Sequence, residues 1–541
     1  DNYLCELKEM QIRDGLHVFG KAPEDRLLND LLVALVRVPR AAGNDGDASL
    51  HRALADDLGL GFDPLECKMS TVWRGPKPEV LQSLSAESWR SNGDTVERLE
   101  ILASQLASNE IPPKPKWEGT AAVLRTLNRE IRPAVEASGE AEIAGITTAL
   151  SGKFLEPGTS GAPTRGRLDV LPTGRNFYSV DTRTVPTPAA WQLGWKSASL
   201  LIERHMQEHG AWPKSIALSA WGTSNMRTGG DDVAQALALM GVQPTWDKVS
   251  RRVTGFEVMP ASILDRPRVD VTLRVSGFFR DAFPGLIDLF DSAARAVTAI
   301  DEPDEVNPAA ERNRAEIEAL KAQGMDADDA AKQAGFRVFG SMPGAYGAGL
   351  QALIDEKGWE SDADLARAYV AWGGYAYGAG SEGQAAHGLF ETRLKSVEAV
   401  IQNQDNREHD ILDSDDYYQF EGGMNAAVRH LSGVQPAAYH MDHSRPETPR
   451  ARTLDEEVAR VVRARVVNPK WIEGVMRHGY KGAFEMAATV DYLFAFAATA
   501  HCVRDHHFDA LFDAYLDDEQ VRQFLADHNP AALAGMSARL L

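Results

Sequence analysis

The chain has 541 residues, of which 44% are hydrophobic and 25% charged, a composition typical of globular protein and long enough for three or four domains of about 150 residues. Its net charge of −21 argues against binding to nucleic acids or anionic membranes, because no excess of basic residues can neutralise phosphate. Three widely spaced cysteines (Cys5, Cys67 and Cys502) predict neither a disulfide framework nor a CxxC metal site, and favour a reducing compartment, the cytoplasm. A start at Asp1, with no signal peptide, indicates a piece of a longer protein.

Residues 1–150 predict a mainly helical domain. Apolar residues recur at intervals of three and four in 27–38 and in 94–107, the spacing of a helix with one buried face. Asp94, followed by Glu97 three residues later, suggests that the second helix begins at Asp94. Nothing in this part indicates catalysis.

Residues 151–305 predict an α/β domain that opens with a long loop rich in glycine and proline (151–187). Segments 215–222, 253–260 and 268–277 have the composition of strands and alternate with helical segments. Such alternation predicts a mostly parallel sheet with helices on its faces. No GxGxxG or GxxxxGK[ST] pattern is found here, so neither a dinucleotide nor ATP is expected to bind through these loops.

Two loops of this domain are candidates for ligand binding. Ligands bind at the carboxyl ends of parallel strands, and the predicted loop 223–230 follows the first strand. In the leading loop, Arg175, Asn176, Tyr178 and Asp181 form a polar set suited to an anionic ligand. The alternative is a long crossover loop in which Arg175 pairs with Asp181.

Residues 306–430 combine two glycine-aromatic segments (337–349 and 372–388) with an acidic run (405–421). Glycines let the backbone approach a flat ligand, and clustered carboxylates bind hard cations or transfer protons. The run contains seven acids against one arginine, and aromatic residues stand among them. The alternatives are tightly packed turns for the glycine segments and a solvated acidic loop for the run.

Residues 431–541 predict a helical C-terminal domain. Its most apolar segment, 483–500, contains two acidic residues and therefore predicts a buried helix rather than a membrane span. Two pairs of possible metal ligands are spaced four residues apart: His501 with Asp505, and Cys502 with His506. This spacing suits a metal site on one face of a helix, although it is equally that of a solvated helix face.

Several blocks, in order along the chain, are similar to those of one protein family. They are LPTGRNFYSVD (171–181), TVPTP (184–188), SAWGTSNMRTGG (219–230), GFFRDAFPGLIDLFD (277–291), LDSDDYYQFEGGMNAAV (412–428) and WIEGVMRHGYKGAFEMAATVDYLFAF (471–496). Together with LCELKEMQIRDGLHVFG (4–20), they resemble the large subunits of class I tetrapyrrole chelatases, the family of the CobN and magnesium-chelatase H subunits. FYSVD and DYYQFEGG favour the cobalt branch of this family.

The resemblance implies a multidomain α/β subunit that binds hydrogenobyrinic acid a,c-diamide and inserts Co²⁺ during aerobic cobalamin biosynthesis. In this family ATP and its Mg²⁺ are bound and the ATP is hydrolysed by the AAA+ partner subunits CobS and CobT. The lack of a phosphate-binding loop in this sequence agrees with ATP being bound elsewhere. One family block, with histidines and a glutamate, would lie N-terminal to residue 1. The alternatives are insertion of Mg²⁺ into protoporphyrin IX, or a docking scaffold for the AAA+ partner whose acidic run 405–416 binds that partner. An unrelated metallohydrolase is disfavoured because no HExxH occurs.

Metal insertion requires a protein to hold the ring, to strip water from the metal and to accept two pyrrolic N–H protons. Our hypothesis is that Asp415, Asp416 and Glu421 deliver the metal or accept protons, helped by His387 and His478. Of these, Asp416, Glu421 and His387 are the expected metal ligands. The expected ring contacts are Arg175, Asn176 and Lys481 for the ring's carboxylates, and Tyr375, Tyr377 and Tyr417 for its face.

Overall fold

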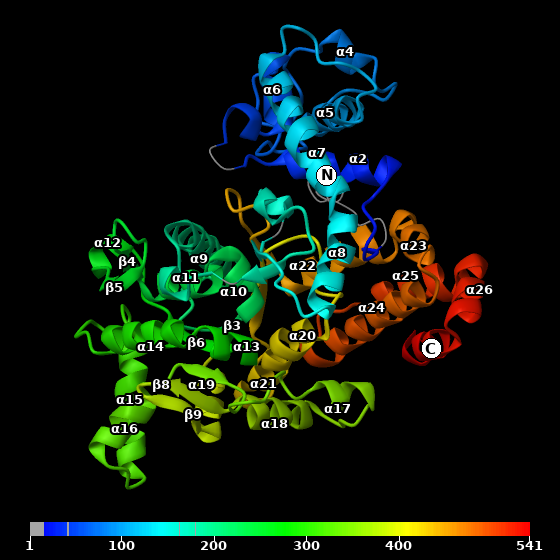
Figure 1. Cartoon of the computed structure of the whole chain (residues 1–541). Helices are drawn as coiled ribbons and strands as arrows, with labels where there is room; N and C mark the ends of the chain where they lie inside the picture. Colours follow the sequence, from blue (N-terminus) through cyan, green and yellow to red (C-terminus); the bar gives the residue numbers. More distant parts are fainter. Residues whose placement is uncertain (1–15, 41–42, 162, 179, 541) are drawn as a thin grey trace. The chain divides into compact units, whose positions relative to one another are not determined.

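A computed structural model of the protein describes residues 16–40, 43–161, 163–178 and 180–540 (Figure 1). The chain forms two compact units. The first comprises Asp1–Tyr178, Asn406–Glu408 and Arg463–Gly482, and the second comprises Ser179–Asp405, His409–Val462 and Ala483–Leu541. The predicted domain boundaries near 150, 305 and 430 fall inside these units.

The first unit is mainly helical, as the spacing of its apolar residues predicts. Its elements are α2 (Asp25–Arg37), α3 (Leu50–Asp57), α4 (Glu79–Gln82), α5 (Asn92–Ala107), α6 (Glu118–Thr126), α7 (Arg132–Glu136), α8 (Ser138–Leu150), β1 (Pro157–Thr159), β2 (Asn176–Tyr178) and α23 (Pro469–Met476). Helix α5 begins two residues before the predicted start. Ser91 and Asp94 form a reciprocal capping box, so Asp94 is the third residue of the helix rather than its cap.

The second unit is built on an eight-stranded sheet with the strand order β12-β11-β10-β3-β6-β7-β8-β9. Its strands are β3 (Ser215–Ala220), β6 (Asp270–Val275), β7 (Val338–Gly340), β8 (Tyr375–Gly378), β9 (Ser381–Ala385), β10 (Ala399–Gln404), β11 (Ala437–Asp442) and β12 (Arg450–Thr453). The five strands from β11 to β7 run parallel, and the strands at both edges run antiparallel. The predicted mostly parallel sheet is therefore confirmed.

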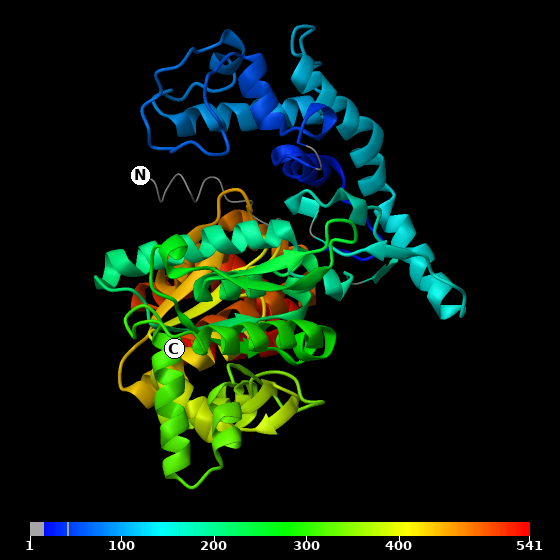
Figure 2. The ribbon, with the colours of Figure 1, turned by 90° about the vertical axis from the view of Figure 1, so that its left-hand side faces the viewer.

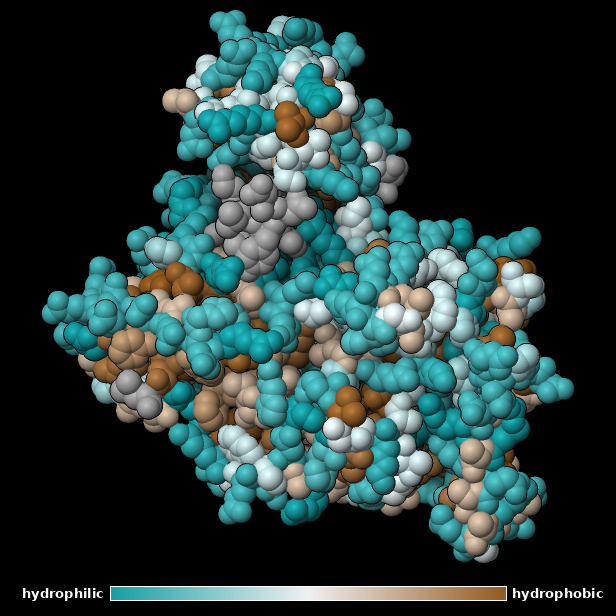
Figure 3. Space-filling model, turned by 180° about the vertical axis from the view of Figure 1, so that it is seen from behind, coloured by the Kyte–Doolittle hydropathy of each residue, from teal (hydrophilic) through white to brown (hydrophobic). Residues whose placement is uncertain are grey.

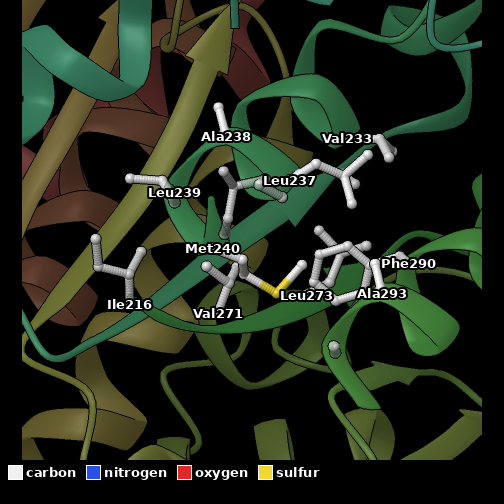
Figure 4. Close-up of a cluster of buried hydrophobic side chains, with 14 of the residues drawn as sticks. Ile216, Val233, Leu237, Ala238, Leu239, Met240, Val271, Leu273, Phe290 and Ala293 are labelled. Carbon is white, nitrogen blue, oxygen red and sulfur yellow. The ribbon is translucent and has the colours of Figure 1, made fainter. Parts of the chain in front are cut away.

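Every residue of the central strands β3, β6 and β10 is buried, as is typical of parallel strands covered on both faces. Figure 4 shows how helix α11 (Asp231–Met240) and helix α14 (Pro284–Thr298) contribute to this core. Leu237 and Met240 of α11 and Phe290 of α14 lie around Val271 and Leu273 of β6. Helices surround the strands in both ribbon views (Figures 1 and 2).

Further helices complete the second unit. They are α9 (Pro188–His209), α10 (Gly222–Thr228), α12 (Ala261–Leu264), α13 (Gly277–Ala282), α15 (Pro308–Ala322), α16 (Ala327–Ala334), α17 (Gln351–Asp355), α18 (Asp362–Gly373), α19 (His387–Lys395), α20 (Asp415–Tyr417), α21 (Gly423–Ser432), α22 (Leu454–Val461), α25 (Asp505–Phe512), α26 (Glu519–His528) and α27 (Pro530–Leu540). Helix α24 (Gly479–Ala500) contains the predicted apolar helix 483–500.

Three predicted elements differ from the structure. The predicted strand 253–260 forms β5 (Val253–Val258), which pairs only with β4 (Val242–Trp246) in a separate antiparallel hairpin. Pro244 within β4 cannot donate a ladder hydrogen bond, which disfavours a central position. The predicted loop 223–230 is mostly helix α10.

The third difference is that the glycine-aromatic segment 372–388 is not a loop but supplies the hairpin β8–β9. Its turn contains a GxGxxG pattern at residues 378–383. Because this turn joins two antiparallel strands rather than a strand and a helix, it lacks the structural context of a dinucleotide-binding loop.

No helix in the described part of the chain is long and apolar enough to cross a membrane. The face of the protein in Figure 3 is mostly hydrophilic, with apolar residues in small groups.

Candidate functional site

The candidate site lies in the second unit, where the parallel strands end. β3 pairs with β6, the next strand of the sheet along the chain, on one side and with the later strand β10 on the other. The strand order therefore reverses between β3 and β10. Open parallel sheets bind ligands at the carboxyl ends of the strands next to such a reversal. Gly222 follows β3 and Gly277 follows β6. A Cβ at Gly222 would lie 2.8 Å from the backbone of Phe278, and one at Gly277 would lie 2.8 Å from the carbonyl oxygen of Ala345, so only glycine allows these segments to pack this closely.

Four exposed apolar side chains lie near these strand ends, and we call them the aromatic edge: Phe278, Met342, Tyr346 and Trp372, exposed by 39%, 49%, 56% and 42%. Phe278 follows β6, Met342 and Tyr346 follow β7, and Trp372 lies near the end of α18. The Trp372 indole donates a hydrogen bond to the Tyr346 carbonyl oxygen at 3.1 Å, and the Tyr346 hydroxyl donates to Asp281 at 2.6 Å. These hydrogen bonds fix the orientation of the Trp372 and Tyr346 side chains. Exposed aromatic faces with fixed orientation suit a flat, largely apolar ligand.

Arg280 fixes the loop that supplies Met342 and Tyr346. Its guanidinium donates to the carbonyl oxygens of Met342 at 2.8 Å and Ala345 at 3.1 Å, and it also pairs with Asp281 at 2.7 Å. Because Arg280 is buried, these hydrogen bonds hold the loop from beneath and leave the aromatic faces accessible.

The predicted acid Asp415 is linked to the same loop through Gln419, and Asp416 is its neighbour in the chain. Gln419 donates to Asp415 at 2.9 Å, and its side-chain oxygen lies 3.9 Å from the position of a Cβ on Gly347. Asp416 is exposed. Partial loss of hydration and the neighbouring Asp415 carboxylate both raise the pKa of Asp416, which makes it a stronger proton acceptor than an ordinary aspartate.

Glu421 is fully buried rather than exposed at the site. It lies in the π-helical turn η6 (Tyr418–Gly422), and its Oε2 is 3.1 Å from Nδ1 of His440 on β11. Burial raises the pKa of Glu421 despite the attraction of His440. Burial alone would lower the pKa of His440, but Glu421 raises it. The two side chains therefore form a hydrogen-bonded pair inside the protein.

The three tyrosines expected at the ring face have different environments. Tyr375 is partly exposed and lies edge-on to His387, with ring centroids 5.0 Å apart. Tyr377 is buried and donates to the Ser341 carbonyl oxygen at 2.5 Å. Tyr417 is also buried, 4.6 Å from the Trp221 ring. Tyr377 and Tyr417 thus support the site from below, and only Tyr375 is open to a ligand.

The structure does not assemble the predicted metal ligands. Among the described residues, no three His, Cys, Asp or Glu side chains are grouped so that they could hold a metal ion. Glu421 points into the core toward His440, and His387 Nε2 lies 3.1 Å from the Ala371 carbonyl oxygen. Asp416, Glu421 and His387 therefore do not form one ligand set here.

The pairs spaced four residues apart near the C-terminus do not share a helix face either. Residues 501–504 are not helical, and α25 begins only at Asp505. Cys502 is buried and His501 is exposed. The predicted i, i+4 geometry is therefore wrong, because the chain changes direction between the two halves of each pair.

The remaining predicted residues belong to the first unit. Arg175 donates to the backbone carbonyl oxygens of Asp169 at 2.8 Å and Leu171 at 3.3 Å, and it does not pair with Asp181. His478 accepts a hydrogen bond from the Leu16 amide at 3.0 Å, and burial, followed by the charge of Arg477, lowers its pKa. Asn176 and Lys481 are exposed.

The acidic run is not a solvated loop. Arg227 donates two hydrogen bonds to Asp405, at 2.8 and 2.9 Å, and Asp405 is buried. Asp410 and Asp413 accept hydrogen bonds from backbone amides within the run. Asp405, Asp410 and Asp413 thus shape the segment, whereas Glu408 and Asp416 are exposed to solvent.

Sequence reasoning missed several residues of this site. Trp372 and Tyr346 lie within the glycine-aromatic segments, so the segments were identified but not their exposed side chains. Phe278 lies within a family block. His440 has no signal in the sequence, because its importance depends on contact with Glu421 from another element.

Comparison with known proteins agrees with the resemblance seen in the sequence. The pattern of the family described as CobN/Magnesium Chelatase matches residues 1–541. The chain is 63% identical to the aerobic cobaltochelatase subunit CobN of Sinorhizobium sp and 58% identical to that of Pseudomonas aeruginosa; each match covers 100% of this chain and 44% of the relative.

A solved structure is also similar along the whole chain. It is the catalytic subunit of cobaltochelatase from Mycobacterium tuberculosis, with a TM-score of 0.88 and 44% identity, over 100% of this chain and 44% of that one. The chain thus spans less than half the length of these relatives. The chain belongs to the CobN/magnesium chelatase family.

Proposed function

We propose that this chain is part of the tetrapyrrole-binding large subunit of an ATP-dependent cobaltochelatase, which inserts Co²⁺ into hydrogenobyrinic acid a,c-diamide in cobalamin biosynthesis. The observation that carries this proposal is the whole-chain match, at 63% identity, to a relative named aerobic cobaltochelatase subunit CobN. ATP hydrolysis is assigned to AAA+ partner subunits of the CobS and CobT kind, in the cytoplasm.

In the proposed reaction the ring lies against the aromatic edge, where Tyr346 and Trp372 present fixed faces. Tyr375 and His387 extend this surface. Arg175, Asn176 and Lys481 of the first unit are proposed to bind the ring's carboxylates, because cationic and amide donors form strong hydrogen bonds to such groups.

Insertion replaces the inner N–H proton of the corrin ring with the metal ion. That N–H bond breaks, its electron pair forms a bond to Co²⁺, the other three ring nitrogens donate their lone pairs, and the released proton needs an acceptor. Asp415 and Asp416 are the proposed acceptors, since Asp415 is hydrogen-bonded to Gln419, which reaches the loop at Gly347, and the pKa of the adjacent Asp416 is raised. Glu421 with His440 supports them from inside the protein, and His478 is a further proposed participant.

A titration tests the substrate assignment. Full-length subunit is titrated with hydrogenobyrinic acid a,c-diamide and, in parallel, with protoporphyrin IX, and quenching of tryptophan fluorescence is measured. We expect saturable binding of the corrinoid and at least tenfold weaker binding of the porphyrin. Preference for the porphyrin would instead support a subunit of the magnesium branch, and no binding of either would favour a docking scaffold.

Replacing Trp372 with alanine tests the aromatic edge. We expect the affinity for the corrinoid to fall about tenfold, which corresponds to about 1.4 kcal/mol, the scale of an aromatic stacking contact. Trp212→Ala is the matched control, because Trp212 is 41% exposed, almost as exposed as Trp372, but is not part of the aromatic edge. Equal affinities of the two variants would contradict a role for Trp372.

A further inference from the structure

Arg274 is a fully buried arginine near the end of strand β6. Its Nη1 donates a hydrogen bond to the carbonyl oxygen of Val275 at 2.6 Å, whereas Nε and Nη2 have no hydrogen-bond partner within 3.5 Å among the described residues. Burial lowers the pKa of its guanidinium. The hydroxyls of Tyr369 and Tyr377 act in the opposite direction, and no carboxylate in the described part of the chain does so. A buried guanidinium without a counter-ion costs stability.

Two aromatic rings stand where a counter-ion would be expected. The guanidinium carbon of Arg274 lies 4.9 Å from the centroid of the Phe420 ring and 5.6 Å from that of the Tyr369 ring. Both distances are within the range of cation–π attraction, which is stronger where water is excluded. Phe420 and Tyr369 are themselves buried, so the charge and both rings are enclosed together. We call Arg274, Tyr369 and Phe420 the cation cluster.

Phe420 connects the cation cluster to the acidic residues of the proposed site. It lies in the π-helical turn η6, which directly continues α20, and α20 begins with Asp415 and Asp416. The Tyr369 hydroxyl donates to the carbonyl oxygen of Phe420 at 3.4 Å. The ring and the backbone of Phe420 are thus both held by the cation cluster, in the same continuous helical segment as the two acids.

The cation cluster also contacts the end of α18. Tyr369 lies on α18, whose last residue, Gly373, follows Trp372. A Cβ on Gly373 would lie 2.9 Å from Nε of Arg274, and one on Gly423, which begins α21, would lie 2.7 Å from the Tyr369 ring. Helices α18 and α21 lie side by side (Figure 1). The cation cluster therefore lies where the end of α18 meets the acidic segment.

Stability alone does not require a charge at this position. Methionine has a flexible, unbranched side chain and would pack between the same two rings without the cost of a buried charge. A guanidinium differs because its attraction depends on lying over the face of a ring, so it restricts where the Phe420 and Tyr369 rings can lie. A side chain that costs stability but fixes geometry is typical of a functional site.

We propose that Arg274 is a positioning residue for metal insertion. Through Phe420 it holds the acidic segment in a fixed place relative to the aromatic edge, so that the proposed proton acceptors meet the ring correctly. The aromatic edge is held independently, by the hydrogen bonds of Trp372 and Tyr346, so loss of Arg274 affects the chemical step more than ring binding. The inference rests on the proposed function, because it concerns the same site.

Arg274→Met tests the proposal in the full-length subunit reconstituted with its AAA+ partners. At saturating hydrogenobyrinic acid a,c-diamide, we expect the rate of cobalt insertion to fall about 100-fold, the cost of displacing a reacting group by about 1 Å. The corrinoid affinity, measured by tryptophan quenching, should stay within about twofold of wild type, because the ring contacts are unchanged. Hydrogen exchange of the β6 amides should be no faster than in wild type, since the variant removes a buried charge without a counter-ion.

Two further variants are controls. Arg274→Lys keeps a cation over the rings and should insert cobalt at least about tenfold faster than Arg274→Met. Arg266→Met lies near the other end of β6, where Arg266 donates to the carbonyl oxygens of Ala238 and Leu239 at 2.6 and 3.0 Å. Its loss should speed hydrogen exchange near β6 but leave the insertion rate within about twofold of wild type, because it removes no contact of the proposed site.

A double-mutant cycle with Phe420 separates positioning from independent packing. Phe420→Leu keeps an apolar side chain but removes the ring face, so it should slow insertion at least about tenfold for the same reason as Arg274→Met. The double variant should be at most about twofold slower than Arg274→Met alone, because residues that act through one shared contact are strongly coupled.

Insertion by Arg274→Met at near the wild-type rate would overturn the proposal. So would insertion by Arg274→Lys as slow as by Arg274→Met, or rate losses of Arg274→Met and Phe420→Leu that multiply in the double variant. Faster exchange of the β6 amides in Arg274→Met, with corrinoid affinity and insertion lost together, would identify a purely structural residue. The proposed function fails separately, if the wild-type subunit neither binds the corrinoid nor inserts cobalt, and the inference then falls with it.

Discussion

Replacing Asp270 with asparagine is expected to lower the free energy of unfolding of the central sheet by about 3–5 kcal/mol at pH 7, the cost of breaking a buried ion pair. Asp270 begins β6 and is fully buried. Arg337 and Arg312 donate to its two oxygens, each at 2.6 Å, and Arg393 lies 3.5 Å away. Asparagine is uncharged, so the guanidinium groups of these three arginines would lose the negative charge that they contact.

The pH dependence follows from the same contacts. Burial by itself would raise the pKa of Asp270, but the charges of Arg337, Arg393 and Arg312 lower it below its ordinary value of 3.8. A lowered folded-state pKa contributes stability that is fully present above the unfolded-state value and is lost as the pH falls through the folded-state value. The difference between wild type and Asp270→Asn should therefore be constant from pH 5 to 8 and shrink only in stronger acid.

Native-state hydrogen exchange of the β6 amides measures this local stability directly. The matched control is Asp304→Asn, which removes an ion pair with Arg314 in which both side chains are about half exposed. We expect a change below about 1 kcal/mol there, because exposed pairs contribute little. Equal effects of the two substitutions would show that Asp270 does not hold the arginine cluster together.

The double substitution of Asp416→Asn and Glu421→Gln is expected to abolish cobalt insertion while tetrapyrrole binding remains within about twofold of wild type. Asp416 faces solvent, and its raised pKa suits proton transfer. Loss of a general base typically costs 10²–10⁴-fold in rate, so Asp416→Asn alone should reduce insertion at least about 100-fold. Both side chains change by a single atom, so neither shape nor ring contacts should alter.

The measurement is cobalt insertion by the full-length subunit reconstituted with its AAA+ partners, alongside corrinoid titration of the same preparations. Asp509→Asn is the control, because Asp509 is an exposed aspartate on α25. Near-normal insertion by the double variant would remove both residues from the proposed chemistry. Loss of binding together with insertion would instead show that the substitutions damage the ring site.

The sequence predicts the fold class because its signals are local. β3 is a run of apolar and small residues between helical segments, and α14 and α15 show their helical spacing in the chain itself. Burial on both faces leaves such central strands no polar positions. Strand β5 was predicted as part of the same sheet, because its local composition does not distinguish a sheet strand from a hairpin strand.

The candidate site was only partly predictable for a related reason. Glycine and tyrosine mark 337–349 and 372–388 as unusual, and both segments lie at the aromatic edge or directly beside it. Which of their side chains face solvent depends on packing. Trp372 is 42% exposed, whereas Tyr377 is buried beneath the same surface.

By itself, the sequence determined the alternation of strands and helices, the family and the segments around the site, since all of these rest on residues near one another in the chain. Only the tertiary structure decided how the acidic residues are used. Asp405 is neutralised by Arg227, Glu421 is enclosed with His440, and Asp416 remains exposed. Asp405 and Glu421 meet partners 178 and 19 residues away, whereas the charge next to Asp416 is that of the adjacent Asp415. The pKa of a carboxylate depends on burial and on all the charges around it, and for Asp405 and Glu421 only the fold brings these partners close.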